Sequence, residues 1–206
     1  MLLASGRPRS LTYIGTTTDT TNTNAYTFSG ASIGAASGDR RVIVLVLGEG
    51  STVTTLSSAS IGGVSADIVV QGSNGQCTAA IIIAAVPTGT TGDIVCTFSN
   101  TKAHCNIGVY RTIGLPANTA TDTGASTADP ATDTLTTTVG GFALALAGST
   151  TPTSLTWTNI TEDYDETLEA AGCASGASIA TTGANISPSG DYASAAGDES
   201  AVFATW

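Results

Sequence analysis

Short apolar runs of strand length, rather than helical periodicity, organise the 206 residues of the chain. Residues 40–48 (RRVIVLVLG) and 77–86 (CTAAIIIAAV) are continuous apolar runs, rich in β-branched side chains and followed by turn residues. Such runs are typical of strands buried inside a fold. Residues 131–139 (ATDTLTTTV) instead alternate, so that every second side chain lies on one face, as in a half-buried strand. The pattern therefore predicts an all-β protein.

The number and spacing of these segments indicate the architecture. About ten to twelve strands separated by turn residues are typical of an antiparallel β-sandwich, of jelly-roll or immunoglobulin-like type. A parallel βαβ fold is disfavoured because no segment is suited to a crossover helix. The other expected strands are 92–99, 104–114, 140–148, 153–161 and 200–206, with weaker ones at 11–17, 25–30, 52–61 and 66–72.

One long linker-like stretch interrupts the strand pattern, at residues 115–130 (LPANTATDTGASTADP). We interpret it as a long surface loop within a single β-sandwich domain of residues 11–206, because the strands after it are few and their apolar runs are suited to complete the first pair of sheets. Residues 1–10 then form an N-terminal arm. The alternative is that this stretch separates two domains.

The charge of the chain limits its partners. A formal charge of −10, from 16 acidic and 6 basic residues, repels polyanions, and no cluster of Lys and Arg is available to neutralise phosphates. We therefore expect no nucleic-acid partner. No segment approaches the ~20 apolar residues of a membrane helix, so no membrane partner is expected. The first residues, MLLASGRPRS, lack the order of a secretory signal, which predicts synthesis in a host cytoplasm.

Two of the four cysteines, Cys96 and Cys105, lie on either side of Asn100-Thr101. If those two residues form the turn of a β-hairpin, the cysteines lie directly opposite each other and both face the apolar layer. The spacing suits neither a zinc site nor a thioredoxin-like motif. Two interpretations stay open: a pair of buried thiols packed side by side, and a structural disulfide across the hairpin.

The other two cysteines, Cys77 and Cys173, lie in Gly-rich neighbourhoods that we expect to be exposed. Three interpretations stay open for them. They are unremarkable free thiols, they bond to each other in a second disulfide, or one of them forms a disulfide with a neighbouring subunit.

Catalytic chemistry is hard to assemble from these residues. The single histidine, His104, is expected on an exposed strand face, and the nucleophile motif G-x-S-x-G does not occur. We therefore predict that the protein is not an enzyme and that it needs no cofactor. A weak calcium site is the one metal hypothesis, at the densest acidic run, 161–169, where several oxygen ligands occur together, although a solvated loop explains the run equally well. Its candidate ligands are Glu162, Asp163, Asp165 and Glu166.

Aromatic side chains matter for a second class of function, because carbohydrate-binding sandwiches commonly present an exposed Trp or Tyr. Trp157 alternates with core positions and is expected to be buried. Trp206 is the other large candidate for such a platform, and Tyr164 and Tyr192 are further candidates for exposed contacts, the alternative being ordinary loop tyrosines.

Four stretches, taken in order, resemble a β-sandwich module of tailed bacteriophages and related prophages. The resemblance covers residues 25–115 best, and it rests on turn and core patterns. It implies a virion structural protein on the particle exterior, of the capsid-decoration, collar or tail-fibre type, and it brings no catalytic residues. The four stretches are RRVIVLVLG, SASIGGVSA, AAIIIAAVPTGTTGDIVCTFS and IGVYRTIGL.

The resemblance implies partners as well. The chain is expected in the virion, bound to other virion proteins and to copies of itself. Arg7 and Arg9 then belong to an arm that docks on acidic groups of a neighbour, the alternative being a disordered tail. The alternative function is a receptor- or carbohydrate-binding fibre module that recognises a host-surface glycan.

Overall fold

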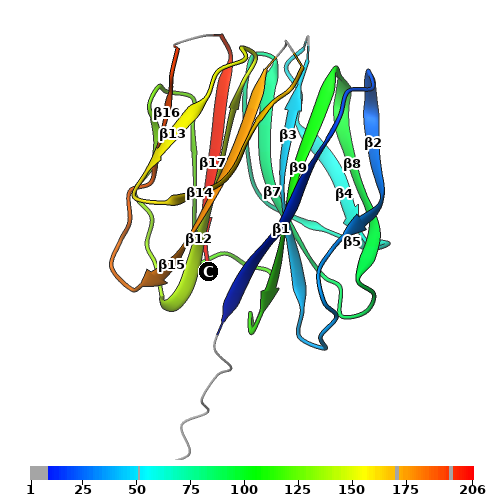
Figure 1. Ribbon diagram of the computed structural model, residues 1–206, viewed down its shortest axis with the longest axis vertical. Helices are drawn as coiled ribbons and strands as arrows, with labels where there is room; N and C mark the ends of the chain where they lie inside the picture. Colours follow the sequence, from blue (N-terminus) through cyan, green and yellow to red (C-terminus); the bar gives the residue numbers. More distant parts are fainter. Residues whose placement is uncertain (1–8, 51, 170–171, 195–196) are drawn as a thin grey trace, which may run out of the picture.

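The computed structural model describes residues 9–50, 52–169, 172–194 and 197–206, and these residues form antiparallel β-sheets without a helix (Figure 1). The predicted all-β sandwich architecture is confirmed. The described residues contain 17 strand segments, more than the ten to twelve expected. Two of the additional segments, Val64–Ser65 and Ser189–Tyr192, have only two and four residues, and such short segments leave no periodic signal in the sequence.

The N-terminal half forms two sheets that face each other. Sheet A has the order β1-β9-β3-β7-β6, and sheet B has the order β2-β8-β4-β5. The strands of sheet A are β1 (Ser10–Asp19), β9 (His104–Ile113), β3 (Arg41–Glu49), β7 (Cys77–Ala85) and β6 (Asp67–Asn74). The strands of sheet B are β2 (Thr23–Ser32), β8 (Thr91–Lys102), β4 (Leu56–Ile61) and β5 (Val64–Ser65).

The C-terminal half forms two further sheets. Sheet C has the order β10-β17-β12-β15-β14, and sheet D has the order β11-β16-β13. The strands of sheet C are β10 (Asp122–Ser126), β17 (Glu199–Thr205), β12 (Val139–Ser149), β15 (Cys173–Thr182) and β14 (Thr161–Thr167). The strands of sheet D are β11 (Ala131–Thr132), β16 (Ser189–Tyr192) and β13 (Leu155–Thr158).

The four sheets stack in the order B, A, C, D, with an apolar core between each neighbouring pair (Figure 1). The first core lies between sheets B and A, the second between A and C, and the third between C and D. The sequence pattern predicted that the C-terminal strands complete the first pair of sheets. That prediction is wrong. These strands build a second pair, which packs on sheet A through the second core.

Stacking explains why the central strands are continuous apolar runs. In β3, Val44 and Val46 face the first core, whereas Leu45 and Leu47 face the second. A strand that is covered on both faces has no solvent-exposed face for polar side chains and becomes mostly apolar, whereas a strand with one solvent-exposed face alternates. Strand β12 follows the same rule, with leucines toward sheet A and alanines toward sheet D.

The segment 115–130 is not one continuous loop, because β10 occupies Asp122–Ser126 and pairs with β17. The part before β10 is tied to both halves of the molecule. Arg41, on β3, donates to the carbonyl oxygens of Leu115 and Pro116, and the indole of Trp206 donates to the carbonyl oxygen of Asn118 at 3.2 Å.

The predicted hairpin around Asn100-Thr101 is wrong. Strand β8 pairs with β2 and β4 in sheet B, whereas β9 pairs with β1 and β3 in sheet A. Asn100 and Thr101 lie inside β8, and Ala103 alone separates the two strands. The chain therefore passes from one sheet to the facing sheet at this point, in an arch rather than a hairpin.

Candidate functional site

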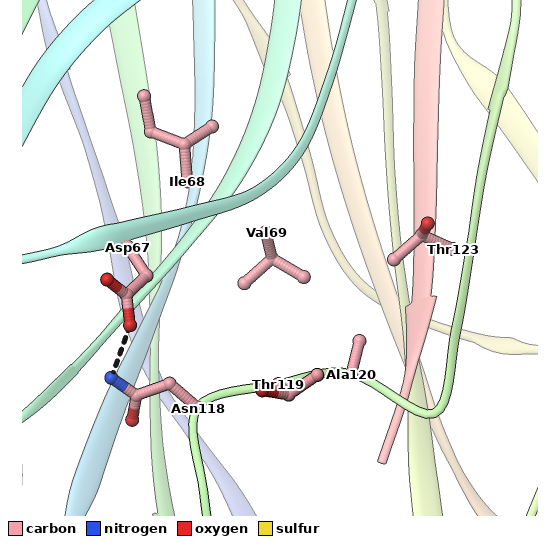
Figure 2. Close-up of a pocket in the computed structure, with 7 residues that line it drawn as sticks. All are labelled: Asp67, Ile68, Val69, Asn118, Thr119, Ala120 and Thr123. Atoms are coloured by element: carbon pink, nitrogen blue, oxygen red, sulfur yellow. Dashed lines mark hydrogen bonds between the residues drawn. The ribbon is translucent and has the colours of Figure 1, made fainter.

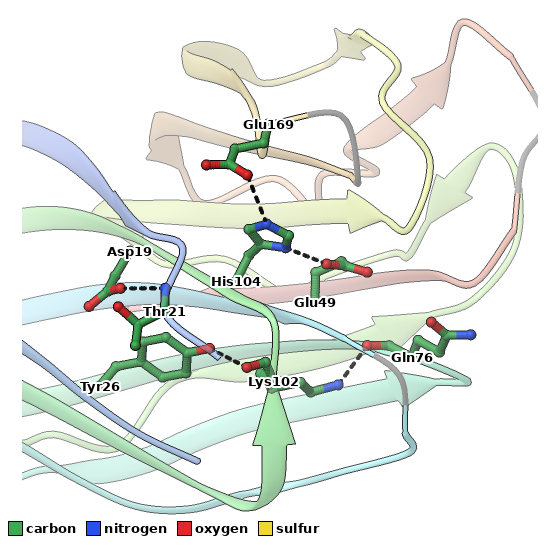
Figure 3. A network of polar contacts seen from close by, with 8 residues as sticks. All are labelled: Asp19, Thr21, Tyr26, Glu49, Gln76, Lys102, His104 and Glu169. Atoms are coloured by element: carbon green, nitrogen blue, oxygen red, sulfur yellow. Dashed lines mark hydrogen bonds and ion pairs between the residues drawn. The ribbon is translucent and has the colours of Figure 1, made fainter. Parts of the chain in front are cut away.

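The densest set of buried ionisable groups lies where β8 meets β9, at one end of the first sandwich (Figure 3). Glu49 ends β3 and stands directly opposite His104, the first residue of β9. Glu49 Oε2 lies 2.7 Å from His104 Nδ1, and the other ring nitrogen, Nε2, lies 3.7 Å from Oε2 of Glu169. Because Glu169 follows sheet C in the second half, this contact joins the two halves of the chain.

The expected exposure of His104 is wrong, because the residue is only 8 % exposed. Its neighbour Cys105 points into the first core, so His104 points the other way, toward sheet C. A sheet face that is normally wet in a two-layer sandwich is covered here by the second half. Sequence reasoning missed both Glu49 and Glu169, because the contacts that bring them to His104 are long-range.

Lys102 lies beside this pair and is completely buried. Its Nζ donates to the carbonyl oxygens of Gln76 at 2.6 Å and Thr52 at 3.2 Å, and its own carbonyl accepts from the hydroxyl of Tyr26 at 2.6 Å (Figure 3). Burial lowers the pKa of Lys102, since it penalises the charged ammonium. The same effect raises the pKa of Tyr26.

This network holds backbone groups and joins strands of different sheets. Lys102 uses two donors on carbonyl groups, and His104 has a carboxylate on each side. Among the residues that the structure describes, no group of three or more His, Cys, Asp or Glu side chains is placed to hold a metal ion. What the geometry does provide is a polar junction between sheets A, B and C.

A shallow groove of about 390 Å³ lies between β6 and the segment that leads to β10 (Figure 2). Its carboxylate, Asp67, accepts a hydrogen bond of 2.7 Å from the amide of Asn118, whose oxygen accepts from Arg41 at 2.8 Å. The remaining lining is small and mixed in polarity, with no second carboxylate or histidine. The other residues that line it are Ile68, Val69, Thr119, Ala120 and Thr123.

The acidic run at 161–169 is a strand for most of its length, so the expectation of a solvated loop is wrong. It forms β14, the edge strand of sheet C, with a bulge between Glu162 and Tyr164. Asp163 accepts from the hydroxyl of Tyr110 at 2.9 Å, whereas Asp165 accepts from the backbone of Leu155 at 3.2 Å.

These two contacts lie toward different parts of the molecule, since Tyr110 belongs to sheet A and Leu155 to sheet D. The carboxylates of Glu162, Asp163, Asp165 and Glu166 thus do not form a common set of ligands, and the calcium hypothesis gains no support from their geometry. Charged side chains on an edge strand do oppose pairing with the edge of another chain.

All four cysteines are free and buried. The expected exposure of Cys77 and Cys173 is wrong: Cys77 lies in the second core and Cys173 in the third. The thiol of Cys77 donates to the carbonyl oxygen of Gly148 at 3.4 Å. Because neither thiol is accessible, a disulfide to a neighbouring subunit would require the sheets to separate first.

Of the two arginines of the expected arm, the structure describes Arg9. Arg9 donates from Nη1 to the hydroxyl of Thr138 at 2.8 Å, within the same chain. Arg7 lies outside the described residues. Docking on a neighbour therefore stays a prediction.

The aromatic side chains do not form a platform for sugars among the described residues. The candidates Tyr164 and Tyr192 are only 7 % and 4 % exposed, and Trp206 is buried. Trp157, expected to be buried, is half-buried, with its indole donating to Ser175 at 2.8 Å. The described residues also include no helix with the length and hydrophobicity that a membrane span requires.

Comparison with known proteins does not place the chain in a family. No family model matches it, and no curated protein matches its sequence. One solved structure found by the comparison is a chain of the Sputnik virophage, from a cryo-EM structure at 3.5 Å resolution. The alignment covers 100% of this chain and 87% of that chain, with 6% identity and a TM-score of 0.19, which is too low to carry an argument.

Proposed function

We propose that the chain is a structural protein on the exterior of a bacteriophage particle, where it stabilises the assembly through contacts with other virion proteins and with copies of itself. The observation that carries this proposal is the stack of four sheets with three continuous cores. Among the groups buried within it, the ammonium of Lys102 is hydrogen-bonded to backbone carbonyls and His104 to Glu49, as a rigid building block requires.

The sequence resemblance supports the same function. Its four stretches map onto β3, the β4–β5 turn, β7 with β8, and β9, which together form most of the first sandwich. Within that sandwich the expected IGG-V turn is formed, since Gly62 and Gly63 connect β4 to β5 with φ of 58° and 78°. These positive φ angles explain why glycine occupies both positions.

The charge of the chain favours the outer surface of a particle. A protein with a formal charge of −10 is repelled by packaged nucleic acid, and binding through many copies requires only a modest patch on each one. Capsid decoration and a collar or tail accessory are the positions that fit this charge.

Mass spectrometry of gradient-purified particles tests the proposal. We expect the chain in a fixed ratio to the major capsid protein, and we expect antibodies against it to label intact particles. Particles that lack the chain should lose infectivity faster on heating and should recover when purified chain is added back. A chain found only in the soluble fraction of the lysate would refute the proposal.

The fibre-module alternative predicts a different result. Isolated chain would bind host cells or a glycan array without other virion proteins. Binding of that kind, together with absence from the body of the particle, would replace the present proposal.

A further inference from the structure

Cys96 and Cys105 face each other across the first core, although they belong to different sheets. Cys96 lies on β8 of sheet B and points toward sheet A, whereas Cys105 lies on β9 of sheet A and points toward sheet B. Both side chains are 0 % exposed and belong to the same apolar cluster. No layer of backbone separates them.

The strand register brings the two residues to the same level of the sandwich. Lys102 pairs with Thr23, and Cys96 pairs with Tyr26, only three positions further along β2. Strand β8 thus uses twice as many residues as β2 over this distance, because its register shifts between these pairs. Cys105 lies three residues beyond Lys102 on the returning strand. Measured from Lys102 along the sandwich, Cys96 thus lies at the level of the third position of β2, and Cys105 lies three residues along β9, so both cysteines are at a similar distance from the arch.

The side chains are in contact. Burial raises the pKa of the Cys105 thiol well above its ordinary value, and a hydrogen bond with the Cys96 thiol adds to that shift. Tyr26, the pairing partner of Cys96, is buried in the same apolar cluster as both cysteines.

We propose that Cys96 and Cys105 form a disulfide that joins sheet B to sheet A across the first core when the chain folds in an oxidising medium. The inference does not depend on the proposed function. The oxidant is a low-molecular-weight disulfide such as oxidised glutathione. One cysteine thiolate attacks it, which releases one glutathione and leaves a mixed disulfide; the second cysteine thiolate then displaces the other glutathione. Two glutathione thiols carry away the electron pair and both protons.

Burial decides when this bond forms. Neither thiol of the folded chain is accessible to a reagent, and a protonated thiol does not attack a disulfide. The exchange therefore takes place while sheets A and B are still apart, during folding in an oxidising medium. A chain that folds in a reducing cytosol keeps both thiols, protected inside the core.

The other two cysteines are not positioned to react in this way. Cys77 faces the second core and Cys173 faces the third, so sheet C lies between them. Cys77 moreover directs its thiol to the carbonyl oxygen of Gly148, a residue of that same sheet. The bond is thus expected to be specific for one pair.

Refolding of the full chain in a glutathione redox buffer tests the proposal. After denaturation and alkylation, oxidised protein should contain two free thiols in place of the four found in the reduced form. The thermal midpoint should rise by about 5–10 °C relative to the reduced protein, the shift expected for closing a short loop in a chain of this size. Four free thiols, or a bond that includes Cys77 or Cys173, would overturn the proposal.

Two variants identify the bond. In Cys77→Ala/Cys173→Ala, trypsin cuts after Lys102, between the remaining cysteines, and the peptide 103–111 should stay joined to the peptide 42–102 until a reductant is added. Cys96→Ala is the control and should show no such joined peptide and no shift of the thermal midpoint between the two buffers. Export of the wild-type chain into a bacterial periplasm gives a measurement that does not depend on refolding. Two free thiols are again expected there, and four would contradict the proposal.

Discussion

The ring of Tyr164, on the edge strand of sheet C, lies directly against Gly108 in the middle of β9. A Cβ atom at position 108 would lie 2.5 Å from Cε1 of Tyr164, closer than side chains approach each other. Tyr164 cannot easily move away, because it is 7 % exposed and its ring stacks on Tyr13 at 5.8 Å. The two halves of the molecule thus approach each other closely because glycine leaves room for an aromatic ring.

Gly108→Ala should therefore destabilise the protein by about 1–3 kcal/mol, the usual cost of adding volume to a packed core. Urea denaturation followed by tryptophan fluorescence measures the change in the free energy of unfolding. Gly38→Ala is the matched control, since a Cβ at Gly38 meets nothing within 4 Å, and it should be close to neutral. Equal stability of the two variants would contradict the packing argument.

A second prediction concerns the buried side chain of Arg40. It is only 1 % exposed, and its guanidinium binds backbone carbonyl groups of two segments of the chain. Its guanidinium donates to Val86 at 2.6 Å, to Gly34 at 2.6 Å and to Thr88 at 2.7 Å. Lysine cannot reproduce this fork of donors. We expect Arg40→Lys to lower the free energy of unfolding by about 2–4 kcal/mol, as for a buried network that loses partners.

The control for this substitution is Arg111→Lys. Arg111 makes a more exposed hydrogen bond, from Nε to the carbonyl oxygen of Ala35 at 2.8 Å, and its replacement should cost less than about 1 kcal/mol. If both variants unfolded at the same urea concentration, the buried donors of Arg40 would not be the source of stability.

The two carboxylates beside His104 should contribute unequally. Glu49 is buried and lies 2.7 Å from the ring, whereas the side chain of Glu169 is 66% exposed and lies 3.7 Å away. Glu49→Gln should cost about 1–2 kcal/mol, because a buried charge-assisted hydrogen bond is lost. Glu169→Gln should cost less than about 0.5 kcal/mol, since water screens an exposed pair. Urea denaturation of both variants at low and high salt measures these costs. A larger loss of stability for Glu169→Gln than for Glu49→Gln would contradict the prediction.

Asp122 should make stability depend on acid pH. Backbone hydrogen bonds from Thr136 at 2.8 Å and Thr123 at 2.9 Å lower the pKa of its carboxylate below the ordinary 3.8. At a pH between the folded and unfolded pKa values the unfolded chain binds more protons, so this contribution is present above 3.8 and is lost as the pH falls through the folded pKa.

Asp122→Asn removes the titrating group while it keeps an oxygen that accepts hydrogen bonds. The variant should therefore lose less stability than the wild type as the pH is lowered below 3.8. Unfolding free energies measured in urea at several acid pH values test this. Parallel curves for the two proteins would show that Asp122 has the same pKa in the folded and unfolded states.

The sequence by itself determined the class of fold and many of its strands. The apolar runs at 40–48 and 77–86 correspond to β3 and β7, and Gly62-Gly63 forms the expected turn. These features depend on local chemistry: which faces of a segment are apolar, and where the backbone must take a positive φ. Cys96 and Cys105 were expected to face the apolar layer opposite each other, but that expectation came from a hairpin that does not exist.

Only the tertiary structure decided which sheet covers each apolar face. A continuous apolar run indicates that a strand is buried on both sides, but the stacking of sheet C on sheet A depends on contacts between residues far apart in the chain, such as Leu47 in β3, whose side chain lies directly against Gly148 in β12. The same long-range packing buried His104, Cys77 and Cys173, all expected at the surface. Whether a side chain is buried depends on which sheet packs over it. That sheet comes from a distant part of the chain, so the local sequence pattern does not specify it.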